Sequence, residues 1–531
     1  MPGRFLPKPE KTAKAEKPAK PEKTAKPEKP AKPEKPAKAD KPSGKTGTQH
    51  SAAAPAGPSA VVVGGGVSGL IAARDLQRAG IRVTVLEAAE RFGGCVGRHK
   101  VAGVVLDSGA ESFATRSPAV PDLIAELGLA ADVVPPNPAG SWLQLAADDL
   151  PSGAQRMPSS GLLGIPADPR HPDIVRALGR AGAARAAMDK VLPVGSLNRR
   201  GSMSLGELVR TRMGEAVLRR LVTPVVGGVY SADPDVLDVD SVAPGLRDAV
   251  GRHGSLAAAV GALRSAAPAG SAVAGLDGGM GRLTEALVAD LETSGALLRT
   301  GVRAEALSRD GQQWRIRCSD GEELAADAVV VAAEGPAAVD LISTALPEVS
   351  AYRPQPGPGV ALVTLVVDLP ELDAMPRGTG VLVAREVEGI DAKALTHATA
   401  KWQWLADSTG PGTHVLRLSY GRALSAEESA AQPAHVDRAD DDLFRQAVAD
   451  ASGLLQVDIK ADDVVGWDVV RWVGALPSAA VGHKDRVGAV RAAVAEAHGL
   501  EAVGAWLAGT GLAAVTADTR TRMAGLTNAI L

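Results

Sequence analysis

The sequence predicts a mixed α/β fold with a Rossmann-like parallel sheet at its centre, and three consecutive features predict it. The apolar run Ala60–Val63 is typical of a buried strand. The pattern Gly64-x-Gly66-x-x-Gly69 that follows predicts a tight turn into a helix. The run Val83–Leu86 predicts the next strand. Together they predict a βαβ unit that binds a dinucleotide.

Each residue of the predicted turn has a physical role. Gly64 permits the turn, Gly66 lets the backbone approach a pyrophosphate, and Gly69 lets the helix pack closely on the strand. The first helical residues, Val67 and Ser68, then direct their N–H groups at the phosphates. We therefore expect these five residues to bind the cofactor.

A carboxylate and a glycine pair complete the motif. Glu87, at the end of the second strand, is placed to accept hydrogen bonds from a ribose 2′-hydroxyl. The pattern Glu87-x-x-x-Arg91-x-Gly93-Gly94 resembles the extension found in the superfamily of flavin amine oxidases, phytoene desaturases and porphyrinogen oxidases. That resemblance implies that the dinucleotide is FAD, held non-covalently by its ADP half. One departure is Cys95, where the superfamily often has a basic residue.

Composition restricts the chemistry and the compartment. The chain has 531 residues, of which 45% are hydrophobic, so more than one domain is expected. The two cysteines, Cys95 and Cys318, form no disulfide framework, which favours a reducing cytoplasm. The nine histidines show no metal-ligand spacing, and we predict neither a metal site nor a catalytic side chain. The segment Ala502–Ala517 is too short to span a membrane.

Residues 1–58 differ from the rest of the chain. Lysine recurs at every third position from Lys8 to Lys41, and residues 1–50 carry 14 Lys/Arg against 6 Asp/Glu. Large apolar residues are missing after Leu6, so we expect a disordered arm. The arm has no apolar core typical of a secretory signal. Its charge either attracts an anionic lipid, a nucleic acid or an acidic partner, or the arm only keeps the protein in solution. Among the partners of the protein as a whole we predict no nucleic acid.

The next motif narrows the resemblance. The stretch Asp107-Ser-Gly109-Ala110-Glu111-Ser112-Phe113-Ala-Thr-Arg116 resembles a segment of the porphyrinogen oxidases of haem synthesis. The resemblance implies that this loop lines the flavin and that its basic end faces the substrate cavity. The loop residues expected to bind the cofactor are Gly109, Ala110, Glu111 and Ser112, and Arg116 is expected to bind substrate.

The segment from Pro118 to about Arg220 has a helical, amphipathic pattern. The resemblance implies a lobe that contacts membrane surfaces and covers the substrate cavity, and an ordinary helical cap is the alternative. The segment Pro224-Val-Val-Gly-Gly-Val-Tyr230 then resembles a porphyrinogen oxidase signature. Tyr230 is expected to line the substrate site or to belong to the core.

The remaining motifs continue in the order of the family. A glycine-rich turn at Gly278–Gly281 precedes a helix, and by resemblance Val302 lies against the adenine. Residues 336–490 alternate apolar strands with polar loops, as expected of a substrate-domain sheet. Leu476 is expected to line the substrate site, and weaker candidates for cationic or polar substrate contacts are Lys401, Arg471 and His483.

The C-terminal segment predicts a second helix N-terminus at the flavin. A strand, a glycine turn and a helix follow one another from Gly499 to Val515. A helix N-terminus can neutralise the negative part of a flavin or its phosphates. By resemblance, the residues expected to bind the cofactor here are Trp506, Gly509, Thr510, Gly511, Leu512 and Val515.

These segments predict a discontinuous arrangement of domains. We expect a disordered arm in residues 1–58 and a helical lobe in residues 118–220. The FAD-binding domain comprises 59–117, 271–335 and 491–531. The substrate domain comprises 221–270 and 336–490.

The resemblance implies a six-electron oxidation of coproporphyrinogen III to coproporphyrin III in haem synthesis, with O2 as acceptor and release of H2O2. The chemistry belongs to the flavin, while the protein supplies the shape and charge of the cavity. We expect transient contact with other enzymes of haem synthesis, in the cytoplasm or at the periphery of a membrane. Oxidation of protoporphyrinogen IX is the first alternative, followed by a flavin amine oxidase or carotenoid desaturase. A non-catalytic FAD-binding partner protein is the alternative from another class.

Overall fold

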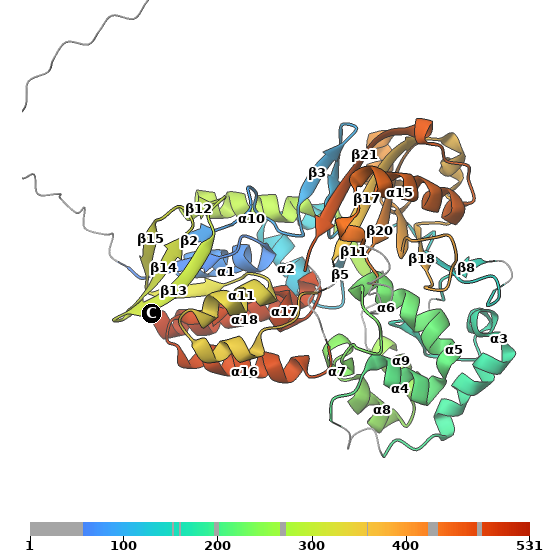
Figure 1. Cartoon of the computed structure of the whole chain (residues 1–531), viewed down its shortest axis with the longest axis horizontal. Helices are drawn as coiled ribbons and strands as arrows, with labels where there is room; N and C mark the ends of the chain where they lie inside the picture. The colour runs from blue at the N-terminus through green and yellow to red at the C-terminus, as the bar shows by residue number, and fades with distance from the viewer. Residues whose placement is uncertain are drawn as a thin grey trace, which may run out of the picture. The chain divides into compact units, whose positions relative to one another are not determined.

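A five-stranded parallel sheet gathers strands from distant parts of the chain (Figure 1). The structure is a computed structural model that describes residues 57–531 apart from 151–152, 159–160, 196–200, 266–271, 358, 423–433 and 475–479. Most of the expected disordered arm therefore lies outside the described residues. The order of the strands across the sheet is β12 (Leu297–Arg299), β2 (Arg82–Leu86), β1 (Ser59–Val63), β16 (Ala328–Val331) and β22 (Leu500–Ala502).

The two faces of this sheet follow from the period-two alternation of strand β1. Ala60 and Val62 point to one face, where they pack with helices α1 (Val67–Arg78), α10 (Gly281–Thr293) and α18 (Leu512–Ile530). Val61 and Val63 point to the other face. That face packs with the three-stranded sheet β13–β15 (Ala304–Asp310, Gln313–Cys318, Glu323–Ala326) and helices α11 (Gly335–Ser343) and α16 (His483–Glu496). Both faces are covered, which explains the almost wholly apolar strand.

A second, seven-stranded sheet is formed largely by the later part of the chain. Its long antiparallel strands are β21 (Val464–Trp472), β17 (Val360–Asp368) and β20 (Thr413–Tyr420), followed in space by β19 (Ala394–His397), β18 (Gly380–Val383), β7 (Trp142–Gln144) and β8 (Ala154–Arg156). Helix α15 (Asp440–Leu455) packs its apolar stripe on one face of this sheet. The hairpin of β3 (Arg98–Val101) and β4 (Val104–Asp107) packs on the other through Val101 and Leu106.

The helical lobe differs from the sequence expectation in its content and in its C-terminal bound. The segment 118–220 also contains strands β7 and β8, which the sequence did not indicate because strands of three residues are too short to show a periodicity. The lobe also continues past Arg220. Its core joins α3 (Pro172–Ala187), α4 (Leu205–Met213) and α6 (Thr223–Tyr230) with α8 (Leu246–His253) and α9 (Leu256–Ser265). The proposed boundary between lobe and substrate domain therefore moves from Arg220 to about Ser265.

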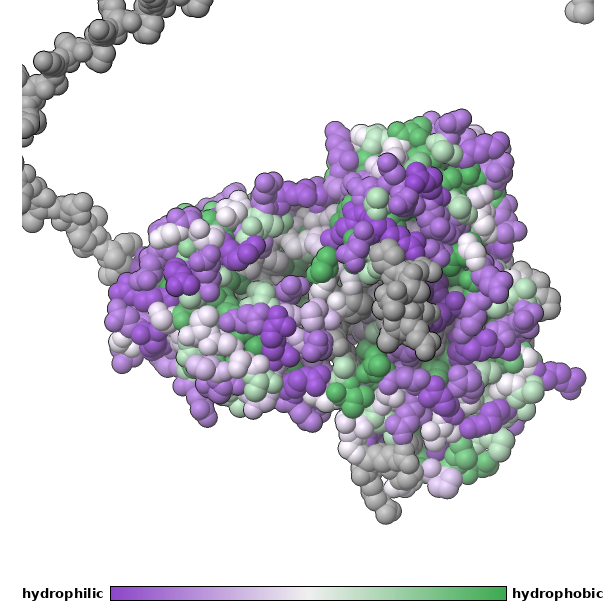
Figure 2. Space-filling model, in the orientation of Figure 1, coloured by the Kyte–Doolittle hydropathy of each residue, from purple (hydrophilic) through white to green (hydrophobic). Residues whose placement is uncertain are grey.

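The surface of the described residues is mainly hydrophilic on the face that Figure 2 shows, with small hydrophobic patches between charged side chains. In the described part of the chain, every helix is too short or too polar to cross a membrane. Contact of the lobe with a membrane surface therefore stays a prediction.

A buried ion pair stabilises the helical lobe. Arg212, on α4, and Asp189 are 2% and 0% exposed in their side chains, and Arg212 Nε lies 2.6 Å from Asp189 Oδ1. Asp189 Oδ2 also accepts a hydrogen bond from Ala257 N on α9, and Arg212 donates to the carbonyl oxygens of Leu192 and Pro193. Because both charges are fully hydrogen-bonded, removal of one would leave the other buried without compensation.

We predict that Asp189→Asn lowers the free energy of unfolding by about 3–5 kcal/mol, because it leaves the Arg212 charge buried and unpaired. The control is Asp310→Asn, which breaks an exposed pair with Arg315 and is expected to cost at most about 1 kcal/mol. Urea unfolding followed by tryptophan fluorescence measures both. Equal losses in the two variants would contradict the account of the buried pair.

Candidate functional site

The turn between β1 and α1 requires its glycines. A side chain at Gly64, whose φ is 106°, would meet Ala332 O at 2.7 Å. A Cβ at Gly69 would lie 1.8 Å from Gly64 O, so the helix and the strand approach too closely for any other residue. A Cβ at Gly66, in contrast, would meet no atom within 4 Å. Gly66 therefore faces open space at the N-terminus of α1.

The N-terminus of α1 has the properties of an anion-binding site. Gly66 is the N-cap, and neither a capping side chain nor an acidic residue occupies the first turn. The N–H groups of Val67 and Ser68 are therefore available to an external acceptor. The predicted strand, turn, helix and second strand are confirmed at this point.

Glu87 lies directly beside this turn. Its Oε2 accepts a hydrogen bond from Gly65 N at 2.7 Å, and its Oε1 accepts one from Ala89 N at 2.7 Å. Two backbone donors thus fix the carboxylate at the end of β2. Val302, which follows β12, donates its backbone N–H to the carbonyl oxygen of Glu87 at 2.9 Å. The structure therefore brings both of these predicted residues to the turn.

The glycine pair Gly93–Gly94 packs on the turn between β1 and α1. Gly93 N donates to Gly65 O at 2.8 Å, and Gly93 pairs with Gly66 in an isolated bridge. Gly93 and Gly94 have φ values of 115° and 55°, which favour glycine. A Cβ at Gly94 would lie 3.4 Å from Gly66 Cα. Gly66, Gly93 and Gly94 thus form one surface at the N-terminus of α1, which we call the glycine surface.

The loop after β4 lies across this glycine surface. Ala110 N donates to Cys95 O at 2.9 Å, and a Cβ at Gly109 would lie 2.2 Å from the same oxygen. Asp107, at the start of the loop, accepts hydrogen bonds from Met280 N and Gly281 N at 3.0 and 2.9 Å, which caps helix α10. Burial raises the pKa of Asp107, and these two hydrogen bonds oppose that effect.

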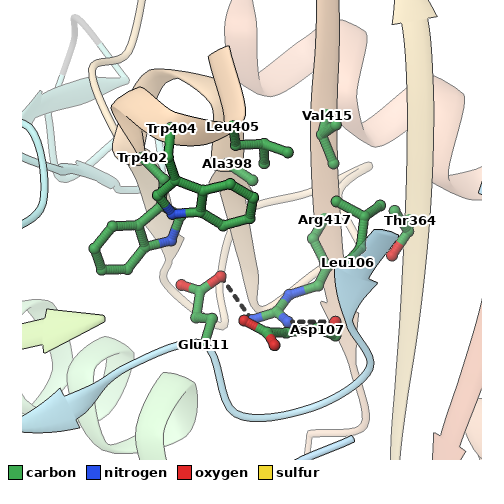
Figure 3. A pocket seen from close by; sticks show the side chains of 10 residues that line it. All are labelled: Leu106, Asp107, Glu111, Thr364, Ala398, Trp402, Trp404, Leu405, Val415 and Arg417. Atoms are coloured by element: carbon green, nitrogen blue, oxygen red, sulfur yellow. Dashed lines mark hydrogen bonds and ion pairs between the residues drawn. The ribbon is translucent and has the colours of Figure 1, made fainter. Parts of the chain in front are cut away.

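Glu111 forms a half-buried ion cluster with two basic residues, of which Figure 3 shows Arg417. Its Oε2 lies 2.9 Å from Arg417 Nη2, and it also pairs with Lys401. Arg417 Nη1 donates to Gly109 O at 2.9 Å, so one guanidinium holds the loop at two points. Burial raises the pKa of Glu111, but the charges of Arg417 and Lys401 outweigh it and hold that pKa at about 2. Glu111 is therefore an anion at neutral pH.

Glu111 and Arg417 of this cluster line a small pocket that is open to solvent. In Figure 3 the side chains of Glu111 and Arg417 point toward one another, and the indole rings of Trp402 and Trp404 lie beside them. The apolar part of the lining comes from residues of β4, α12 (Ala398–Lys401) and β20, namely Leu106, Ala398 and Val415. Lys401, expected as a substrate contact, directs its charge to Glu111.

Sequence reasoning missed Arg417. The strand β20 reads Thr-His-Val-Leu-Arg-Leu-Ser-Tyr, and Arg417 is the one Lys or Arg in it. A cation between two leucines of a central strand must find a partner, because its burial without one is costly. That signal was present, but the partner, Glu111, is 306 positions away, and the pairing appears only in the fold.

The C-terminal motif forms a second glycine turn at a helix N-terminus. Gly509 and Gly511 have φ values of 96° and 114°, and a Cβ at either would meet no atom within 4 Å. Gly511 is the N-cap of α18, whose first turn contains no acidic residue. Helix α18 packs against α1, Leu512 packs against the core that α1 shares with the parallel sheet, and Val515 is buried. Two uncapped helix N-termini thus belong to neighbouring helices.

Two aromatic residues lie at this second turn. The hydroxyl of Tyr230, at the end of α6, donates to Val242 O at 3.4 Å. Burial raises the Tyr230 pKa, and the nearby Thr510 side chain opposes that effect. Trp506, on α17 (Ala505–Ala508), is 4% exposed, and its Nε1 has no hydrogen-bond partner among the described residues. The structure thus joins Tyr230, predicted from the middle of the chain, to the C-terminal motif.

The remaining predicted residues have other positions. Arg116 is exposed in the segment after β5 (Phe113–Ala114), and Ser112 is half-buried just before that strand. Arg471 pairs with Asp440 and donates to Val436 O and Arg438 O, so its charge is used within the sheet domain. His483 is buried at the start of α16; burial lowers its pKa, and a hydrogen bond with the Trp506 backbone opposes that effect. Leu476 lies outside the described residues.

Within the described ranges, no cluster of three or more His, Cys, Asp or Glu residues is arranged to hold a metal ion. The site is instead built from backbone N–H groups, glycines and one ion cluster. Such a surface suits the phosphates and the flat ring of a nucleotide cofactor.

Comparison with known proteins agrees with this geometry. The sequence profile of the family described as flavin containing amine oxidoreductase matches residues 67–508. The chain is 32% identical to a coproporphyrinogen III oxidase of Mycobacterium leprae over 444 residues, which cover 81% of this chain and 90% of the relative. It is 28% identical to that of Bacillus subtilis over 464 residues, 85% and 94% of the two chains.

Solved structures show the same fold. A crystal structure of a candidate protoporphyrinogen oxidase from Exiguobacterium sp. 255-15 superposes with a TM-score of 0.74 at 27% identity, covering 89% of this chain and 99% of that one. A putrescine oxidase, 15% identical, reaches a TM-score of 0.59 over 89% and 99% of the two chains and supports the fold alone. The family match, which covers most of the chain, and the glycine turns at two helix N-termini lead to one conclusion: the chain belongs to the flavin containing amine oxidoreductases and is a flavin-dependent oxidoreductase.

Proposed function

We propose that this enzyme oxidises coproporphyrinogen III to coproporphyrin III in haem synthesis. The observation that carries the proposal is that relatives named coproporphyrinogen III oxidase align with more than four-fifths of the chain. The overall reaction removes six electrons and six protons from the substrate, and three molecules of O2 take them up as three molecules of H2O2. Protoporphyrinogen IX is the second candidate substrate, because a protoporphyrinogen oxidase of Arabidopsis thaliana is 29% identical over 219 residues.

The proposed cofactor is FAD, bound without a covalent link. The open space beside Gly66 and beside Gly509 and Gly511 fits a cofactor that runs between two helix N-termini. The uncapped N–H groups of α1 would hold the pyrophosphate, and Glu87 would accept hydrogen bonds from the ribose. When bound, FAD supplies the acceptor for a hydride equivalent from the porphyrinogen.

The side chains of this protein position the loop and the substrate. Glu111, Lys401 and Arg417 hold the loop of Gly109 against the glycine surface. Arg116, which follows this loop and has an exposed side chain, is proposed to bind a propionate of the substrate, since a guanidinium matches a carboxylate with two hydrogen bonds. Tyr230 is proposed to line the macrocycle beside Thr510.

The proposed setting is the cytoplasm, with contact between the helical lobe and a membrane as a further proposal. The hydrophilic face in Figure 2 fits both settings. Transient contact with other enzymes of haem synthesis remains a proposal for residues 1–58, whose net charge is opposite to that of the rest of the chain.

We predict that the purified, FAD-loaded enzyme forms porphyrin in air from coproporphyrinogen III faster than from protoporphyrinogen IX. The measurements are the growth of porphyrin fluorescence and the release of H2O2, with heat-denatured enzyme as the control for spontaneous oxidation. Faster turnover of protoporphyrinogen IX would favour the second candidate. Turnover of neither porphyrinogen would refute the proposed function.

We predict that Arg116→Ala raises KM for coproporphyrinogen III about 10-fold or more, because it removes a charge-assisted hydrogen bond to a propionate. Flavin content and kcat are expected to change little. Arg252→Ala, an exposed arginine on α8, is the matched control. If Arg116→Ala is purified without flavin, Arg116 has a structural role and not the one proposed.

We predict that Glu111→Gln lowers both flavin affinity and stability, because it leaves Lys401 and Arg417 without their shared counter-charge. Since the folded-state pKa of Glu111 is about 2 and its usual value 4.5, the carboxylate stabilises the protein by about 3 kcal/mol above pH 4.5. This advantage over Glu111→Gln is lost as the pH falls from 4.5 towards 2.

Urea unfolding at several pH values and FAD titration of the apoprotein test this role of Glu111. The control is Glu285→Gln, which breaks a more exposed pair with Arg98 and is expected to cost less than about 1 kcal/mol. A stability difference between the wild type and Glu111→Gln that stays constant between pH 7 and the acid limit of folding would contradict the assignment.

A further inference from the structure

A cationic pocket lies beside α6, where Thr223, Gly227 and Ser231 contribute to its lining. It is small and open to solvent, and it lies between α6 and the strands β18 and β19. Helix α6 approaches β18 closely there, since a Cβ at Gly228 would lie 2.8 Å from Leu382 Cδ2. The polar and charged residues that line the pocket are Thr223, Ser231, Asp233, Arg385, Lys393 and Arg422.

Lys393 is a buried cation with no acidic partner. It is 3% exposed, and the partner that the structure gives its Nζ is the Ser231 hydroxyl. No carboxylate of the described residues lies within ion-pair distance of it. Burial lowers the Lys393 pKa to about 7, and the neighbouring charge of Arg422 acts in the same direction. A charged lysine at this position therefore needs an anion from outside the described residues.

Arg422 places a second positive charge beside Lys393. Its Nη2 donates to Val383 O and Ala392 O at 3.2 and 2.8 Å, which fixes the guanidinium, and the carboxylates of Glu386, Asp391 and Asp450 partly offset its charge. Its Nε is buried and has no hydrogen-bond partner. Lys393 and Arg422 thus bring two positive charges to one pocket, where a bound anion would lower their mutual repulsion.

The backbone at Ser231 is also unusual. Ser231 caps the C-terminus of α6 with a φ of 51°, a left-handed conformation that is uncommon for residues other than glycine. This conformation turns the chain so that Tyr230 meets Thr510 while Ser231, 1% exposed, meets Lys393. Consecutive residues thus contact the candidate flavin site and the cationic pocket.

We propose that this pocket is a carboxylate-binding site in which Lys393 and Arg422 supply the positive charge and Ser231 a hydroxyl. A single carboxylate fits better than a phosphate, because Asp233 at the pocket would repel a dianion and already lies 3.9 Å from Arg385. The carboxylate comes either from a propionate of the substrate or from a free organic acid. The first source rests on the proposed function, whereas carboxylate binding itself does not.

The test compares the wild type with Lys393→Met, which keeps most of the length of the side chain and removes its charge. Thermal unfolding is followed in sodium propionate and in sodium chloride of equal ionic strength. We expect propionate to raise the Tm of the wild type by about 1–2 °C at concentrations well above Kd and to leave Lys393→Met unchanged. Lys460→Met, which removes an exposed lysine, is the matched control and should respond like the wild type.

Turnover of coproporphyrinogen III separates the two sources. A KM raised about 10-fold or more in Lys393→Met, together with the lost response to propionate, assigns the pocket to a substrate propionate. An unchanged KM with the lost response assigns it to a free carboxylate. If the wild type oxidises neither porphyrinogen, the proposed function fails while the Tm comparison still decides whether the pocket binds a carboxylate.

The proposal is overturned if propionate raises the Tm of the wild type no more than sodium chloride does, or if it raises that of Lys393→Met equally. Lys393 would then be a neutral buried amine that only contacts Ser231. Lys393→Gln serves as a second variant, and both variants should fold because each removes an unpaired buried charge. The wild-type measurement alone is sufficient to reject the site.

Discussion

The ion cluster of Glu111 with Lys401 and Arg417 is the interaction on which the arrangement of the site depends. Glu111 belongs to the loop that lies against the glycine surface of the parallel sheet, whereas Arg417 lies in the middle of the seven-stranded sheet and Lys401 ends α12 beside it. The cluster therefore fixes the distance between the two sheets at the position where a cofactor and a substrate would meet. Its low exposure makes the Coulomb attraction stronger than in water.

The glycine turns provide the complementary surface. Gly64 and Gly69 are required by close packing, whereas Gly66, Gly509 and Gly511 face open space. The first two hold helix α1 on the sheet, and the other three leave room for a ligand at the N-termini of α1 and α18. Glycines that look alike in the sequence therefore have two different reasons to be glycine: some are required by close packing, and the others leave room for a ligand.

The sequence predicted those parts of the fold that depend on local patterns. Strand β1, the turn at Gly66 and the turn at Gly511 follow from apolar runs and glycine spacing, and the motifs also indicated the flavin family. The sequence did not reveal Arg417 or Lys393, because their partners are distant in the chain and their roles depend on burial. Helices α8 and α9 were assigned to the substrate domain, since an amphipathic stripe shows that a helix is buried but not against which neighbour.

In the proposed reaction, a porphyrinogen delivers its electrons directly to the flavin of this enzyme. The most direct measurement is to mix the FAD-loaded enzyme with coproporphyrinogen III in the absence of oxygen and to follow the visible absorption of the flavin. The account predicts that the absorption of the oxidised flavin disappears while porphyrin appears, and that admission of O2 restores it. Flavin absorption that stays unchanged in the presence of excess coproporphyrinogen III and of protoporphyrinogen IX would contradict the account.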